Sequence, residues 1–285
     1  MDIRVLQYFL AVAREESITK AAKALQMTQP PLSRQLKDLE EEVGKQLLIR
    51  GSKKVTLTED GMLLRKRAEE MIDLMEKTKA ELSSSNENIN GEIYIGGGET
   101  DAISFFAQAA ATLQKEHPLI HYHIYSGDAG KIKKKIDKGL IDFGLLIGPF
   151  DVTKYDYMRL PMTDAWGVLM RKDSPLAEKE SVCAEDLWDK PLILSHQASI
   201  SSEMISWLKK DVSKLNVVMT YDLIYNASHF VRKGLGYVIA LDKLINTTGD
   251  SELCFRPLYP RMEAELCIVW KKYQVFSRAS NEFLS

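Results

Sequence analysis

Hydrophobic residues in the first part of the chain recur at the spacing of helices. The opening segment has apolar residues three and four positions apart, which is typical of one buried helical face. These residues are Leu6, Phe9, Leu10 and Ala13. A short second helix is expected after Ser17, whose side chain can cap its first turn. The pattern therefore predicts two helices within residues 1–27.

A third helix is predicted from about residue 29, with Thr28 as its cap. Its apolar stripe consists of Leu32, Leu36, Leu39 and Val43. Its other face carries polar side chains that can bind bases and phosphates, because Arg can pair with guanine and Gln with adenine. These are Gln29, Ser33, Arg34 and Lys37. An ordinary solvent-exposed face remains the alternative for this helix taken alone.

Two short strand-like runs follow, at residues 47–50 and 55–57, and predict a hairpin. Its basic residues are Arg50, Lys53 and Lys54. Lysines are also common at solvated turns. However, a basic hairpin directly after three such helices has the order of a winged helix-turn-helix, which favours contact with the DNA backbone or minor groove.

A long helix is predicted over residues 58–82, with Thr58 as its cap. Its apolar positions alternate between spacings of four and three, the pattern of a coiled-coil seam. They are Leu64, Ala68, Met71, Met75, Thr78 and Leu82. A second copy of the chain is the expected partner, and packing of the stripe on the protein's own body is the alternative. Residues 83–88 are expected to form a flexible hinge.

From residue 91 the chain alternates between strand and helix patterns. Strands are expected at 93–95, 121–125 and 141–147, and helices at 102–116 and 132–138. This alternation predicts an α/β fold with a mostly parallel sheet. The chain is expected to cross into a second lobe near 157–161 and to return near 265. A ligand would then lie in the cleft between the lobes.

Composition adds less than the pattern does. The chain has 285 residues, enough for several domains, and a formal net charge of −2. Residues 1–60 hold ten basic and nine acidic side chains. Attraction to DNA must therefore come from the clustering of basic side chains on one surface and not from the total charge. No apolar run approaches the roughly 18 residues of a membrane span, and the N-terminus does not have the pattern of a signal peptide. We therefore expect a cytoplasmic protein.

Sequence motifs of catalysis, metal binding and cofactor binding are not found. The three cysteines, Cys183, Cys254 and Cys267, are expected to be free thiols, with a redox pair of the last two as the alternative. His121 and His123 share a strand face, where solvated side chains are expected and not metal ligands. No phosphate loop or dinucleotide fingerprint is present. We expect no enzyme activity, no metal and no cofactor.

The first sixty residues closely resemble the LysR-type family of bacterial transcriptional regulators. The likeness is carried by the runs 6–13, 17–22, 29–36, 39–40, 43–44, 47–50 and 57–61. It implies that Gln29, Pro30, Pro31, Ser33 and Arg34 meet DNA and that the hairpin meets its backbone. Leu48 departs from the aromatic residue usual in the family, and we expect a substitution within the core.

The second half resembles, more loosely, the family's two-lobed effector domain, which is similar to periplasmic binding proteins. The likeness rests on residues 142–146 and 234–238. The proline that often follows the second motif is absent. The likeness implies effector contacts from the glycine turn at 96–98 and from several loops. The expected residues are Gly98, Thr100, Asp128, Ile147, Gly148, Ser195 and His196.

The expected organisation is a winged helix-turn-helix at 1–60, a dimerising linker helix and hinge at 61–88, and an effector-binding domain at 89–285. Lobe I is expected at about 89–161 and 265–285, and lobe II at about 162–264. The expected partners are promoter DNA, a second copy of the chain, and an effector such as an amino acid or small organic acid. Family members commonly form tetramers, so a homotetramer is implied. Glu99, Asp101 and Asp128 disfavour a strongly anionic effector.

Two other classes of protein compete with this interpretation. A metabolic enzyme would need a nucleophile paired with a base, which the sequence does not offer. A transport binding protein would account for the second half of the chain but not for the first sixty residues. Both alternatives therefore explain less of the sequence than a DNA-binding regulator does.

Overall fold

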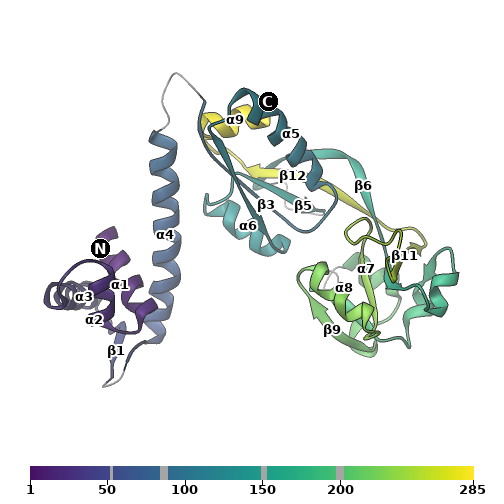
Figure 1. Ribbon diagram of the computed structural model, residues 1–285, viewed down its shortest axis with the longest axis horizontal. Coiled ribbons are helices and arrows are strands. Elements are labelled where there is room, and N and C mark those ends of the chain that lie inside the picture. Colours follow the sequence, from purple (N-terminus) through teal and green to yellow (C-terminus); the bar gives the residue numbers. More distant parts are fainter. Residues whose placement is uncertain (52–53, 84–88, 149–152, 197–201) are drawn as a thin grey trace. The chain divides into compact units, whose positions relative to one another are not determined.

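The computed structural model describes residues 1–51, 54–83, 89–148, 153–196 and 202–285. The chain divides into two compact units, Met1–Ser83 and Ser84–Ser285 (Figure 1). Most of the predicted hinge, residues 84–88, lies outside the described residues. Each unit has its own hydrophobic core.

The first unit contains the predicted helices and hairpin. The helices are α1 (Ile3–Glu15), α2 (Ile18–Ala24), α3 (Gln29–Val43) and α4 (Glu59–Ser83), and the hairpin strands are β1 (Leu48–Arg50) and β2 (Val55–Leu57). The strands pair antiparallel, with Leu48 opposite Leu57. The order of elements is that of a winged helix-turn-helix.

Two of the three predicted helix caps are confirmed. The Ser17 hydroxyl accepts a hydrogen bond from the Lys20 N–H at 3.3 Å, and the Thr58 hydroxyl accepts one from the Gly61 N–H at 2.9 Å. The prediction for Thr28 is wrong, because its side chain makes no capping bond. A capping side chain binds the N–H of the second or third helical residue. In α3 those residues are Pro30 and Pro31, which have no N–H.

The core of the first unit follows the predicted apolar stripes. Leu6, Phe9, Leu32 and Leu36 are fully buried, and so is Leu48, which confirms the expected core substitution. Val43 departs from the pattern with 37% of its surface exposed, because α3 ends there and Gly44 turns the chain with φ +67°. The buried stripe of α3 therefore ends at Leu39.

The second unit contains two α/β lobes. Lobe I has the parallel strands β3 (Gly91–Gly97), β4 (Ile120–Ser126) and β5 (Phe143–Ile147), with helices α5 (Ile103–Glu116), α6 (Ala129–Asp137) and α9 (Arg278–Leu284). Lobe II has the parallel strands β8 (Leu192–Ser195), β9 (Val217–Tyr221) and β10 (Tyr237–Leu241), with helices α7 (Ser202–Leu208) and α8 (Ile224–Arg232). Strands β7 (Val182–Cys183) and β11 (Leu253–Tyr259) and short 3-10 helices at Pro175–Glu178, Ala184–Leu187 and Val212–Lys214 complete lobe II.

Two long strands, β6 (Tyr155–Arg171) and β12 (Glu263–Lys271), connect the lobes (Figure 1). β6 pairs with β12 up to Ala165 and with β10 from Trp166 onward, so it changes lobes later than the expected 157–161. All pairings of β6 and β12 are antiparallel. The sheet is therefore mixed and not mostly parallel, because parallel pairing is confined to strands within each lobe.

The alternative of a redox pair between Cys254 and Cys267 is wrong. All three cysteines are free thiols. Cys254 packs in a lobe II cluster and Cys267 in a lobe I cluster. Burial raises the pKa of both thiols, which makes them less reactive.

Candidate functional site

The first half of α3 presents the predicted polar face to solvent. Gln29, Pro30, Pro31 and Arg34 are exposed and Ser33 is half-buried. Lys37, one turn further along, lies 3.3 Å from the Glu41 carboxylate. The opposite face of α3 lies in the core, so another molecule can reach α3 at this polar face.

The hairpin beside α3 carries two described basic side chains, both in ion pairs. Arg50 lies 3.5 Å from Glu40, and Lys54 lies 3.3 Å from Glu16. Lys53, the third predicted residue, lies outside the described residues. The exposed pair of Lys54 and Glu16 contributes at most about 1 kcal/mol, so Lys54 can exchange its partner for a phosphate.

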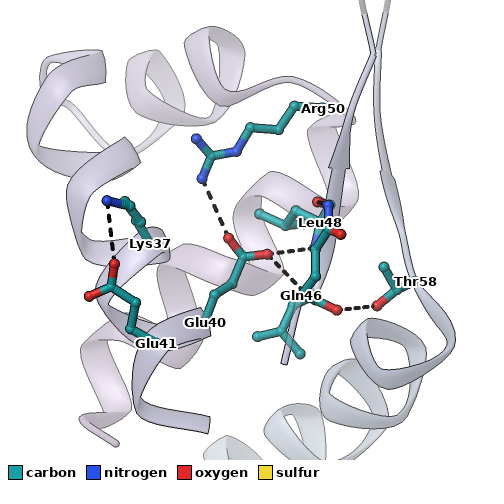
Figure 2. A network of polar contacts seen from close by, with 8 residues as sticks. Lys37, Glu40, Glu41, Gln46, Leu48, Arg50 and Thr58 are labelled. Atoms are coloured by element: carbon teal, nitrogen blue, oxygen red, sulfur yellow. Dashed lines mark hydrogen bonds and ion pairs between the residues drawn. The ribbon is translucent and has the colours of Figure 1, made fainter. Parts of the chain in front are cut away.

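Glu40 connects α3 to the hairpin, a role that the sequence pattern does not indicate. One of its carboxylate oxygens accepts hydrogen bonds from the N–H groups of Leu47 and Leu48, at 2.7 and 2.9 Å (Figure 2). The other oxygen pairs with Arg50. The Thr58 hydroxyl donates to the Gln46 carbonyl at 2.7 Å and joins the start of α4 to the same loop. Glu40 is therefore a positioning residue that sets the angle between α3 and the hairpin.

The apolar stripe of α4 has two parts with different surroundings. Ala68 is buried, and Leu64 packs against the core of the first unit. Further along, Met71 is 39% exposed and Leu82 is 82% exposed. Leu74 belongs to the same face and is 41% exposed, although the predicted seam does not include it. The first turns of the stripe therefore pack internally and the later turns have an uncovered apolar face, while pairing with a second copy stays a prediction.

The second unit contains a cavity of about 560 Å³. Six of the seven residues predicted to bind an effector line it: Gly98, Asp128, Ile147, Gly148, Ser195 and His196. They come from β3, from the loop before α6, and from the ends of β5 and β8. The C-terminal ends of the parallel strands thus bring together residues that are far apart in the sequence.

Thr100 corrects the prediction for the seventh residue. It is buried and does not line the cavity. Its hydroxyl donates a hydrogen bond to Asp164 and accepts one from the Ala102 N–H at 3.2 Å. The hydroxyl that was expected to meet an effector is therefore used to hold the start of α5 against β6.

Asp164 is a fully buried carboxylate at the point where β6 changes lobes. Thr100 occupies one oxygen, and the other has no hydrogen-bond partner among the described residues. The nearest cation, the half-exposed Lys243, lies 3.9 Å away. Burial raises the pKa of Asp164. The ionised form is therefore less stable in the fold than in water.

We expect Asp164→Asn to stabilise the second unit by about 1–2 kcal/mol at neutral pH, because the amide keeps an acceptor for Thr100 without a buried charge. A raised pKa means that wild-type stability falls as the pH rises through the folded pKa. The gain from Asn should therefore grow with rising pH and vanish in acid. Thermal unfolding midpoints at pH 5 and pH 7.5 measure it, with the exposed Asp250→Asn as control. A lower midpoint for Asp164→Asn at pH 7.5 would show that the Lys243 pair outweighs desolvation.

Six carboxylates line the cavity, and their partners differ. They belong to Glu99, Asp128, Glu203, Asp222, Glu263 and Glu265. Lys131 on α6 pairs with both Asp128 and Asp222, at 3.1 and 3.2 Å. Glu99 accepts a hydrogen bond from the Ile224 N–H at the start of α8, and burial raises its pKa.

His121 and His123 on strand β4 were predicted to be solvated side chains and not metal ligands. His121 and His123 lie 3.4 and 2.6 Å from the two oxygens of Glu92. Within the described ranges, no group of three or more His, Cys, Asp or Glu side chains could hold a metal ion. Nor does any helix in those ranges have the length and apolar character to cross a membrane.

Comparison with known families identifies both units. Residues 3–62 match the bacterial regulatory helix-turn-helix protein family of lysR type, and residues 86–285 match the LysR substrate binding domain. The chain is 26% identical to the Hca operon transcriptional activator HcaR of Escherichia coli, over 95% of this chain and 92% of that protein. It is 32% identical to the transcriptional regulator AlsR of Bacillus subtilis, over 68% of this chain and 64% of that protein.

The fold of the whole chain is also found in solved structures. Full-length CbnR, crystallised with its target DNA, superposes with a TM-score of 0.78 at 17% identity, over 100% of this chain and 98% of CbnR. CbnR alone superposes with a TM-score of 0.77 at 16% identity, over 100% of this chain and 97% of that chain. At these identities the likeness concerns the fold.

Proposed function

Because this chain belongs to the LysR family of bacterial transcriptional regulators, we propose that it binds a promoter as a dimer and responds to a small molecule in the cavity of its second unit. The observation that carries the DNA-binding role is the exposed polar face of α3 beside a basic hairpin. A recognition helix enters the major groove, and a wing touches the backbone. The CbnR structure with target DNA, which has the same fold, supports this assignment.

The roles of individual residues follow from their positions on α3 and the hairpin. Arg34 and Gln29 are exposed near the start of α3 and read base edges. Arg50 and Lys54 contact phosphates, and Glu40 holds Arg50 in place. Lys37 adds positive charge near this surface, where each phosphate contact strengthens binding at low salt. The same role is proposed for Lys53 from its place in the sequence.

The dimer is formed through the uncovered apolar face of α4. Met71, Leu74 and Leu82 expose hydrophobic surface on one side of this helix. A second copy of α4 covers such a face by coiled-coil packing. Two α3 helices in one dimer then read two half-sites of a palindromic sequence.

A footprint on the DNA upstream of the protein's own gene tests this function. The dimer is expected to protect two half-sites about one or two helical turns apart. Affinity for that site should fall steeply with salt and exceed affinity for unrelated DNA by about 1,000-fold or more. Equal affinity for the upstream DNA and for a shuffled sequence at the same salt would contradict specific promoter binding.

A further inference from the structure

We propose that the cavity of the second unit binds a ligand with a positively charged amine or amidine attached to an apolar group. This inference rests on the proposed effector role of the cavity and specifies the chemistry of the effector. It goes beyond the expectation of an amino acid or small organic acid, because it assigns the decisive contact to a cationic group.

The charge of the cavity lining favours a cation. Arg261 is the one Lys or Arg among the described lining residues, and it pairs with Glu263 at 2.8 Å. If Lys131 beside the cavity is added, two cations face six carboxylates, which leaves a formal charge of −4. No ion pair joins Glu99, Glu203 or Glu265 to another described residue. A concave surface with this excess attracts cations and repels anions.

Glu99 is the carboxylate best placed to select a charged group. It is half-buried on the glycine-rich turn after β3, and its pKa is raised because it has lost part of its hydration. A carboxylate in this state gains more from a nearby ammonium group than an exposed carboxylate does. One oxygen is already occupied by the Ile224 N–H, so an incoming N–H donor has the other oxygen to bind.

Much of the remaining wall is apolar and selects the body of the ligand. Ile147, Trp166, Leu241, Leu244 and Met262 contribute to it. An aromatic ring such as that of Trp166 also attracts cations to its face. A purely ionic ligand such as a metal cation or a short diamine would leave this surface uncovered. The two features together fit an amphipathic organic cation.

Glu99 also takes part in a contact between the two lobes, so a ligand that binds it can affect how the lobes are arranged. Glu99 belongs to lobe I and bonds to Ile224 of lobe II, and Lys131 of lobe I pairs with Asp222 of lobe II. A cation bound at Glu99 therefore lies beside two contacts that bridge the lobes. A ligand whose bond to Glu99 is stronger in one arrangement of the lobes than in another has a way to alter lobe closure.

Calorimetric titration of the full chain tests the charge assignment even while the natural ligand is unidentified. The probes in each series share one apolar group: 2-phenylethylamine against 3-phenylpropanoate and 2-phenylethanol, and hexylamine against heptanoate and hexanol. We expect each amine to bind at least tenfold more tightly than its matched carboxylate and alcohol. Added salt should weaken the amine and leave the alcohol unchanged.

Two matched variants locate the effect. Glu99→Gln keeps an oxygen for the Ile224 N–H and should weaken amine binding about tenfold without weakening carboxylate binding. Glu116→Gln removes the same charge from the far end of α5 and should bind as wild type. If Glu99→Gln does not fold, the selectivity of the wild-type chain still decides the proposal.

The possible failures are distinguishable. Tighter binding of the carboxylates would overturn the cationic assignment but leave an effector cavity in place. Tighter amine binding that Glu99→Gln does not change would overturn the role of Glu99. Binding by no member of either series would overturn both the charge assignment and the proposed effector role of the cavity.

Discussion

Met71→Lys is expected to convert the dimer to a monomer and to abolish binding to palindromic DNA. Met71 lies on the uncovered apolar face of α4, 39% exposed in the single chain. In a dimer this face is buried, and an unpaired ammonium group there costs about 3–5 kcal/mol. Association should therefore weaken by more than about 100-fold, since each 1.4 kcal/mol is tenfold. Light-scattering mass and footprint length measure the two effects.

Asp73→Lys is the matched control for this prediction. Asp73 is exposed and lies two residues from Met71, on the opposite side of α4. It introduces the same ammonium group without placing it in the apolar face, so dimer mass and footprint should be those of wild type. If Met71→Lys leaves some oligomer, footprint length is the decisive readout. Identical mass and footprint for wild type and Met71→Lys would mean that another surface forms the dimer.

Arg34→Ala is expected to remove base recognition at one position in each half-site. Arg34 is exposed on the first half of α3, where a guanidinium group can donate two hydrogen bonds to guanine. Its loss should cost about 1–3 kcal/mol per half-site and should flatten sequence preference at that position. Binding to a library with every base substituted at each operator position measures both quantities. Unchanged operator affinity at matched salt would remove Arg34 from the recognition surface.

Lys54→Ala provides a contrast, because it removes a phosphate contact and not a base contact. It should weaken binding to all sequences alike and lower the slope of log affinity against log salt by about one per hairpin. Sequence preference should be unchanged. If Arg34→Ala and Lys54→Ala gave the same uniform loss, α3 would contribute charge to DNA binding but no sequence recognition.

Local pattern was sufficient to predict the elements of the DNA-binding unit. The apolar stripes of α1 and α3, the caps at Ser17 and Thr58, and the hairpin all depend on residues close together in the chain. The failure at Thr28 was also local, because Pro30 and Pro31 remove the N–H groups that a cap requires. Glu40 was missed because its partners, Leu47, Leu48 and Arg50, lie on another element.

In α4 the sequence determined the existence of one apolar stripe but not what covers it. Leu64 packs against the core of the first unit and Ala68 is buried, while Met71 and Leu82 are exposed. Heptad spacing is the same in both parts of the helix. The packing of α4 against α1 and β2 distinguishes internal packing from a surface available to a partner.

The effector cavity also separates what the local pattern predicts from what depends on tertiary contacts. Resemblance and strand ends were enough to predict six of its lining residues, because the C-terminal ends of parallel strands gather at one edge. Thr100 was misplaced, since whether a side chain at a turn points to a cavity or to a buried carboxylate depends on β6, more than sixty residues away. The pattern along the chain was enough to predict the elements of the first unit and of lobe I up to β5, together with their order. Which carboxylates share a cavity could not be predicted from the local pattern, because it depends on contacts between segments that lie far apart in the chain.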